Sequence, residues 1–145
     1  MKLSTRTQYG LRMLCQLAAE YDNGPMQLGE IVSREGISEK YLGQIMLILR
    51  SSGLVLAVRG SQGGYYLSRP PHAVSVREVF EILEGELLGA DGEAGTGRDP
   101  RSMQAAANEV WSKLRGAMAG ALDSYTLTDL VGIRLRKQGS SEYSI

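Results

Sequence analysis

Cysteine and histidine, two residues that often bind metals or take part in catalysis, are nearly missing from this sequence. Its 145 residues include one cysteine, Cys15, and one histidine, His72. A single cysteine excludes a disulfide within the chain and any zinc or iron–sulfur site that needs several thiolates from one chain. One cysteine and one histidine also cannot supply a nucleophile–base pair and a metal cluster. We therefore expect no catalytic residues, no metal site and no enzymatic activity.

Long apolar runs are also lacking. No stretch approaches the ~18 to 20 apolar residues that cross a bilayer, so we expect no membrane partner. The N-terminal stretch MKLSTRTQYG turns polar after three residues, whereas a signal peptide continues into an apolar core. These two features predict a cytoplasmic protein.

Net charge is zero over the whole chain, but it is unevenly distributed. Residues 1–69 carry 8 Lys and Arg against 5 Asp and Glu, a net of +3, and residues 70–145 carry 8 against 11, a net of −3. Nucleic acids attract positive surfaces. A surface for nucleic acid is therefore expected in the first half.

Apolar periodicity predicts three helices in this first half. The first covers residues 5–21 with Ser4 or Thr5 as its cap, and the second is short and ends at Gly36. Ser38 can cap a third helix that stops at Gly53. A short helix, a turn containing glycine and a second helix make a helix-turn-helix pattern.

Two β-rich runs follow these helices. LVLAV at 54–58 and YYL at 65–67 flank a glycine-rich loop at 60–64, which predicts a hairpin or wing. A phosphate-binding loop is the alternative, but it needs the N-terminus of a following helix and usually a Lys-Ser/Thr pair. The residues after the loop read YYLSRPP, so that alternative fails. Residues 1–69 are predicted to form a winged helix-turn-helix domain.

The second half is predicted to mediate dimerisation and sensing. Ser75 and Glu78 form a capping-box pattern at a helix start, 85–98 reads as a flexible loop, and Asp99-Pro100 is typical of another helix start. This long helix, ending near residue 122, has an apolar stripe with too little remaining chain to cover it. A second copy of the chain is the expected partner of its stripe residues, Val110, Trp111, Leu114 and Met118.

The chain after this long helix has weaker patterns. Residues 126–130 read as one turn of helix, and 134–145 as a mobile tail. The dimerisation and sensor region is therefore expected to span residues 70–133.

Four segments in register, MKLSTRTQYGLRML, LGEIVSREGISEKYLGQIMLILRSSGLV, VRGSQGGYYL and VREVFEILEG, resemble the Rrf2 family of bacterial winged-helix transcription regulators. The resemblance implies a mainly α fold: a winged helix-turn-helix with a two-stranded β wing and a long C-terminal dimerisation helix. It also implies a homodimer that binds palindromic operators, most often as a repressor. Recognition helices would enter the major groove and wings would touch the minor groove.

The start of the recognition helix carries the predicted base contacts. The exposed positions are expected to be Ser38, Glu39, Lys40 and Tyr41, followed by Gln44 one turn later. Gln44 can pair with adenine, and Lys40 can donate to guanine or phosphate. A solvated helix face is the alternative interpretation. The family commonly has glutamate where this chain has Gly43, so a relative's operator sequence should not be transferred.

Further contacts are expected from the wing and the N-terminus. Arg59 stands where a cation can enter a narrow minor groove, and Ser61 lies in the same loop. An ordinary hairpin with a solvated arginine is the alternative. Lys2 and Thr5 resemble the family's phosphate-contacting start, although Lys2 can equally be a solubilising charge.

Many family members hold a [2Fe–2S] cluster through three cysteines in the loop before the dimerisation helix. The corresponding loop here, EGELLGADGEAGTGRDPRSMQ, has neither cysteine nor histidine. No iron–sulfur cluster or other cofactor is therefore expected. In this respect the chain resembles the cluster-less, CymR-type members, which repress cysteine metabolism and are controlled through a partner enzyme, a cysteine synthase.

The sequence is also compatible with two other functions. One is a regulator that senses iron–sulfur or redox state through atypical ligands, such as the carboxylates Asp91, Glu93 and Asp99, or through Cys15. Solvated carboxylates and a buried, inert thiol are the competing interpretations. The other is a winged-helix adaptor that binds protein, which would need an apolar recognition face where this chain has SEKY and Gln44.

Overall fold

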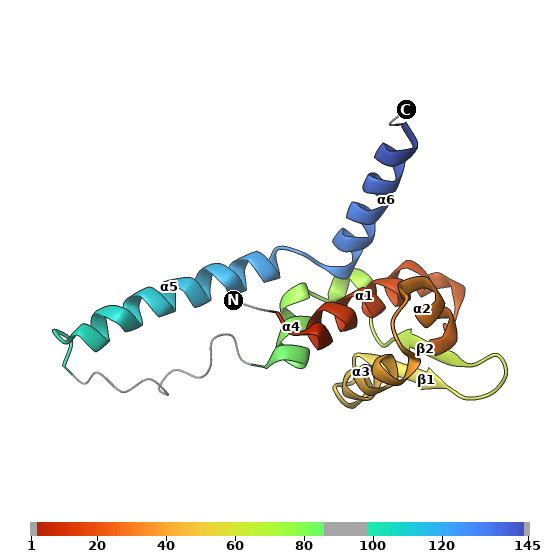
Figure 1. The fold of residues 1–145 in the computed structure, drawn as a ribbon, viewed down its shortest axis with the longest axis horizontal. Helices are drawn as coiled ribbons and strands as arrows, with labels where there is room; N and C mark the ends of the chain where they lie inside the picture. The colour runs from red at the N-terminus through yellow and green to blue at the C-terminus, as the bar shows by residue number, and fades with distance from the viewer. Residues whose placement is uncertain (1–2, 86–98, 144–145) are drawn as a thin grey trace.

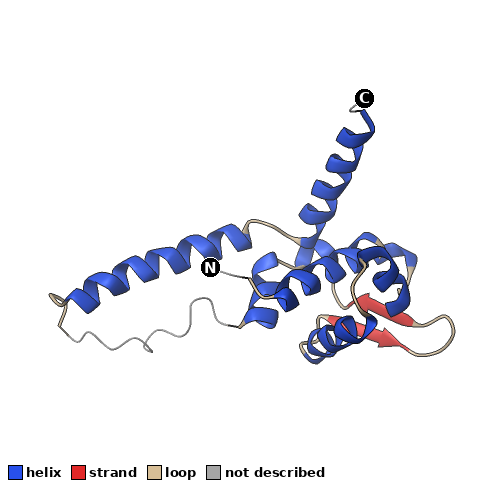
Figure 2. Cartoon of the chain, viewed as in Figure 1, coloured by secondary structure: helices blue, strands red, loops and turns tan. Residues whose placement is uncertain are grey.

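A computed structural model describes residues 3–85 and 99–143 of the chain. Six α-helices, two short 3-10 helices (Tyr21–Asn23 and Pro71–Ala73) and one antiparallel pair of strands appear in these ranges (Figures 1 and 2). This is the predicted mainly α fold with a two-stranded wing. In chain order the elements are α1 (Thr5–Ala19), α2 (Leu28–Glu35), α3 (Glu39–Ser51), β1 (Val55–Val58), β2 (Gly64–Leu67), α4 (Val76–Glu84), α5 (Met103–Asp123) and α6 (Leu127–Tyr143).

Serine caps set the starts of four helices. The side chains of Ser4, Ser38, Ser75 and Ser102 each accept the backbone N–H of the third residue after them, which satisfies a donor that the first helical turn leaves free. The α5 helix therefore begins after Ser102, and the predicted start at Asp99-Pro100 is wrong. The carboxylate of Asp99 instead accepts the N–H of Arg101 at 2.9 Å and closes a local turn.

The α1 helix lies at the centre of the molecule and packs against α2, α3, α4 and α6. Its Met13 and Leu14 are fully buried. The same apolar cluster takes in Val74, Leu83 and Leu127 from the second half of the chain, so one core serves both halves. At Gly10 a Cβ atom would stand 2.3 Å from Cδ1 of Leu83, and α4 packs this closely because glycine has no side chain.

The wing is tied to the start of α2. β1 pairs antiparallel with β2, with Val55 opposite Leu67 and Val58 opposite Gly64. Met26, just before α2, adds a further pairing: its N–H donates to the carbonyl of Tyr65 at 2.9 Å and its carbonyl accepts from the N–H of Tyr65 at 2.7 Å. The hairpin is therefore anchored to the helix-turn-helix along its second strand.

The helices α5 and α6 project from this body (Figure 1). A short bridge holds the start of α6 beside α4, because the N–H of Leu127 donates to the carbonyl of Val74 at 3.0 Å. The predicted single helical turn at 126–130 is too short, because α6 continues to Tyr143 and takes in most of the segment 134–145 that was expected to be a tail. Apart from Gly85, the predicted loop at 85–98 lies outside the described residues. None of the described helices has the length and apolarity to cross a membrane.

Candidate nucleic-acid interface

The first turn of α3 is held by a cap and presents polar side chains. The hydroxyl of Ser38 accepts the N–H of Tyr41 at 3.2 Å, which leaves its own proton free to donate. Glu39, Lys40 and Gln44 are exposed. The predicted recognition residues therefore occur on an ordered helix start with their polar groups available to a ligand.

Tyr41 has a structural role as well. Its ring meets the ring of Tyr9 edge-on, with centroids 5.7 Å apart and planes at 77°, a favoured aromatic geometry. The guanidinium of Arg12 lies over the ring of Tyr9, 5.2 Å from its centroid. This stack fixes the orientation of α3 on α1. Removing the Tyr41 ring would therefore disturb the position of α3 as well as any contact with DNA.

A groove runs between the start of α1 and the exposed side of α3. It brings together three predicted site residues, Thr5, Tyr41 and Gln44, and it also includes Arg6. The Nε of Arg6 donates to the carbonyl of Leu83 at 3.0 Å, which holds the side chain in place. Arg6 was not among the DNA contacts predicted from the sequence. The only sequence feature that points to it is its position as a basic residue in the first turn of the first helix.

The second predicted contact region is the wing. Arg59 directly follows β1, and both Arg59 and Ser61 are exposed. The carbonyl of Ser61 accepts from Nε2 of Gln27 at 3.3 Å, which ties the loop to the start of α2. The loop projects outward from the body at the right of Figure 1. Lys2, the remaining predicted contact, lies outside the described residues.

Several cations of this surface have no anionic partner. Among residues 3–85 and 99–143, the side chains of Lys40, Arg50 and Arg59 enter no ion pair or hydrogen bond. By contrast, Arg12 and Arg34, on another face of the same domain, are paired with glutamates at 2.7 to 3.1 Å. Unpaired Lys and Arg side chains on the recognition helix and the wing are available to neutralise the phosphates of a DNA backbone.

Gly43 lies on the side of α3 that faces α2. A Cβ atom there would stand 3.9 Å from Cδ2 of Leu28, an ordinary van der Waals distance. A larger residue therefore fits at this position. The structure gives no packing reason for glycine, and its effect is the loss of one side chain from the recognition helix.

A cluster of hydrogen bonds joins the start of α1 to the end of α4. Ser4 donates from its hydroxyl to Oε2 of Glu84 at 2.7 Å, and the hydroxyl of Thr7 donates to the same oxygen. The hydrogen bonds from Thr7 and Ser4 lower the pKa of Glu84 below its ordinary value. At neutral pH the carboxylate therefore holds the α1 side of the groove in place.

The residues of this chain do not fit a [2Fe–2S] cluster held by three cysteines, as described above for many members of the family that it resembles. Its one thiol, Cys15, lies within α1, and burial raises the pKa of that thiol from 9.0 to about 11. A cysteine binds a cluster as its thiolate, and a cluster needs several protein ligands. Of the carboxylates considered as atypical ligands, Asp91 and Glu93 lie outside the described residues, and Asp99 is exposed and already binds Arg101.

We expect Cys15 to be a slow nucleophile. A pKa raised by about 2 means that, below pH 9, the thiolate fraction is about 100-fold lower than in an unfolded chain. Alkylation by iodoacetamide at pH 8 should be slower by about that factor in the native protein than in guanidinium chloride. The native rate should keep rising with pH beyond 9. A plateau near pH 9 would show an ordinary exposed thiol and would reopen the redox alternative.

The predicted dimerisation stripe is exposed in the single chain. No residue of α5 is buried, and Val110, Trp111 and Leu114 are 58%, 48% and 43% exposed. Met118 is half-buried. The described part of the chain thus leaves a large apolar face on α5 uncovered, as the prediction requires.

Comparison with known proteins agrees with this architecture. The family model for Rrf2, described as an iron-dependent transcriptional regulator, matches residues 3–133. The transcriptional regulator CymR of Bacillus subtilis is 37% identical over 130 residues, which cover 90% of this chain and 89% of the relative.

Solved structures show the same likeness. The structure of CymR, the global cysteine regulator of B. subtilis, has a TM-score of 0.79 and 34% identity, covering 92% of this chain and 98% of that one. IscR of T. potens has a TM-score of 0.74 and 36% identity, covering 92% and 88%. These relatives are transcriptional regulators and not enzymes. The chain therefore belongs to the Rrf2 family of DNA-binding, winged-helix transcriptional regulators.

Proposed function

We propose that the protein is a repressor that binds palindromic operators as a homodimer. The observation that carries the proposal is the set of unpaired cations, Lys40 and Arg59, on an anchored recognition helix and wing. Gln44 adds an exposed amide that suits adenine. Because its target is chromosomal DNA, the protein acts in the cytoplasm.

The proposed repressor works without the family's three-cysteine iron–sulfur cluster. Its single cysteine and the high pKa of Cys15 support this. The likeness to the global cysteine regulator CymR supports operators near genes of cysteine metabolism. It also supports control through a partner protein, such as a cysteine-synthase-like enzyme, or through a small effector.

The exposed recognition face speaks against a protein-binding adaptor. The core of a protein–protein interface is depleted of charged residues, whereas Glu39 and Lys40 are charged and exposed. The exposed apolar residues Val110, Trp111 and Leu114 lie on α5, away from the recognition helix (Figure 1), while on α3 itself Leu47 is exposed.

The test is DNA binding by fluorescence anisotropy, with the DNA upstream of the protein's own gene as probe. Affinity should fall at least ~10-fold between 50 and 200 mM salt, because phosphate contacts release counterions. Changing Lys40 and Arg59 together to alanine should weaken binding about 100-fold, since each contact contributes ~1 to 3 kcal/mol.

The matched control changes the lysines of α5 and α6, Lys113 and Lys137, to alanine. Both are exposed and lie outside the proposed interface. Equal effects of the two double variants, or an affinity indifferent to salt, would count decisively against the proposed interface.

A further inference from the structure

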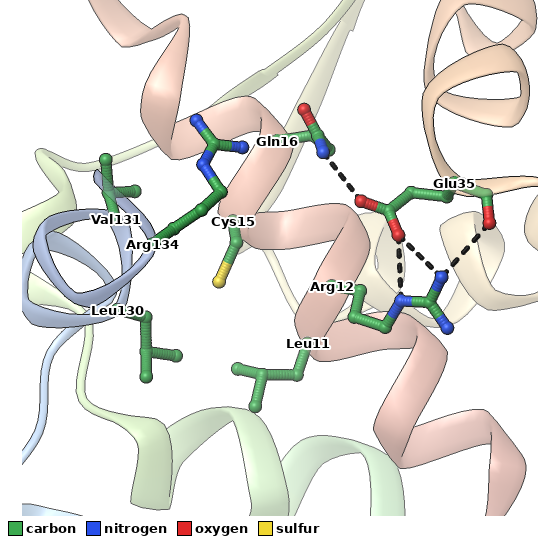
Figure 3. A pocket seen from close by; sticks show the side chains of 8 residues that line it. All are labelled: Leu11, Arg12, Cys15, Gln16, Glu35, Leu130, Val131 and Arg134. Carbon is green, nitrogen blue, oxygen red and sulfur yellow. Dashed lines mark hydrogen bonds and ion pairs between the residues drawn. The ribbon is translucent and has the colours of Figure 1, made fainter. Parts of the chain in front are cut away.

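A cavity of about 310 Å³ opens between α1, the end of α2 and the first turns of α6 (Figure 3). Its walls are largely apolar, with Leu11 and Cys15 from α1 facing Leu130 and Val131 from α6. Arg134 of α6 also lines the cavity. The volume lies at the lower end of the range for small-molecule sites, ~300 to 1,000 Å³.

The side chain of Arg134, which lines this cavity, has a donor that lacks a hydrogen-bond acceptor. Its Nε is buried and has no hydrogen-bond partner among the described residues. A buried donor without an acceptor is unfavourable and uncommon in native proteins. The guanidinium is also permanently charged, so the acceptor that suits it best is an anion.

The nearest carboxylate of the cavity is already bound to other side chains. Oε2 of Glu35 accepts from Nε of Arg12 at 2.8 Å, and Oε1 accepts from Nε2 of Gln16 at 2.6 Å. Figure 3 shows these bonds from Glu35 to Arg12 and Gln16, and no bond from Glu35 to Arg134. Glu35 therefore neutralises Arg12 and is not the partner of Arg134.

The other acid near Arg134 is also bound elsewhere. Glu20 is close enough for Arg134 to contribute to lowering its pKa, but its two oxygens accept from Asn23 at 2.8 Å and from Arg34 at 3.1 Å. The high pKa of Cys15 leaves that thiol uncharged at neutral pH. Within the described residues, the guanidinium of Arg134 therefore has no carboxylate bonded directly to it.

We propose that this cavity binds a small organic anion, a carboxylate with a short branched apolar body. The carboxylate would accept from Arg134, and the apolar body would contact Leu11, Leu130 and Val131. Such a ligand supplies a hydrogen-bond acceptor for the buried Nε of Arg134 and an apolar group that fills the apolar part of the cavity.

The position of the cavity gives the ligand a regulatory role. It contacts α1 and the last residue of α2, which support the recognition helix, and it contacts α6 on the other side. A ligand there would hold α6 against the helix-turn-helix and shift its population of conformations. This regulatory role rests on the proposed function, but binding to the cavity does not.

The experiment compares 4-methylpentanoate with its uncharged amide, 4-methylpentanamide, as NMR probes of the methyl groups in the whole protein. Saturable shifts at Leu11, Leu130 and Val131 are expected, with the carboxylate binding at least ~10-fold more tightly because it pairs with a buried cation. Arg134→Met should abolish the preference for the carboxylate. Arg136→Met, which removes an exposed arginine from the same helix, should leave it intact.

Folding of the variants is monitored by thermal melting. Arg134→Met should melt at or above the wild-type temperature, because it removes a buried donor without a partner. The site is wrong if the three methyl groups do not respond up to the solubility of 4-methylpentanoate, or if amide and acid bind equally. It is also wrong if Arg134→Met folds and still prefers the acid.

Operator affinity is measured separately with and without 4-methylpentanoate. Binding at the cavity that changes operator affinity supports the regulatory role, and binding that leaves it unchanged overturns that role alone. A protein that binds the carboxylate but no DNA would overturn the proposed function and leave the site standing.

Discussion

Changing Leu114 to glutamate should convert the proposed dimer into a monomer. Val110, Trp111 and Leu114 lie on one side of α5 and are exposed in the single chain. In a helix-to-helix interface a glutamate at the centre of this group would be buried without a partner, which is strongly unfavourable. We expect the dimer dissociation constant to rise at least ~1,000-fold, equivalent to about 4 kcal/mol.

Sedimentation velocity would measure this change, and anisotropy on a palindromic operator should show a parallel loss of affinity, because two half-sites are then no longer bound by one linked pair. Ser112→Glu is the control, since Ser112 is exposed on the same helix and lies opposite the apolar stripe by helical spacing. A Leu114→Glu protein that sediments as a dimer would place the dimer interface elsewhere.

The second large effect is expected from Gly64→Ala. Gly64 has a φ of 149°, and a Cβ atom there would stand 2.4 Å from the carbonyl oxygen of Met26 and 2.5 Å from its carbonyl carbon. Backbone atoms cannot move aside as a flexible side chain can, so the bridge between Met26 and Tyr65 must break. We expect a loss of about 3 kcal/mol in the free energy of unfolding, or ~10 °C in Tm.

Gly29→Ala is the matched control for this loss. Gly29 lies in the first turn of α2 with open space around the position of a Cβ atom, so alanine should be neutral or slightly stabilising. Thermal melting followed by circular dichroism measures both variants. Equal melting temperatures for Gly64→Ala and the wild type would mean that the wing is not anchored to Met26.

Local signals explain how much of this fold could be predicted from the sequence. The caps at Ser4, Ser38 and Ser75 and the stop at Gly36 depend on side chains within three or four residues. The capping box at Ser75 is only half-formed, because Ser75 accepts the N–H of Glu78 as expected while the carboxylate of Glu78 pairs with Arg69. An ion pair with Arg69, nine residues earlier in the chain, takes the place of the local contact.

The features that could not be predicted depend on distant contacts. The groove at α1 and α3 joins Arg6 to Gln44, and no short pattern links these positions. The cavity at Arg134 joins α6 to Cys15 in the segment that was expected to be a mobile tail. That segment has little amphipathic character, so its helix could not be recognised from apolar spacing.

The single core also has a consequence for the order of events during synthesis. Leu127 is fully buried against a cluster that contains Met13 and Leu14, and the bridge from Val74 to Leu127 closes that cluster. A nascent chain that has emerged only as far as the wing therefore exposes the apolar face of α1. In the proposed dimer the apolar stripe of α5 is the interface. It leaves the ribosome before Leu127 can close the core, so two chains growing side by side can pair before either is ready to bind DNA.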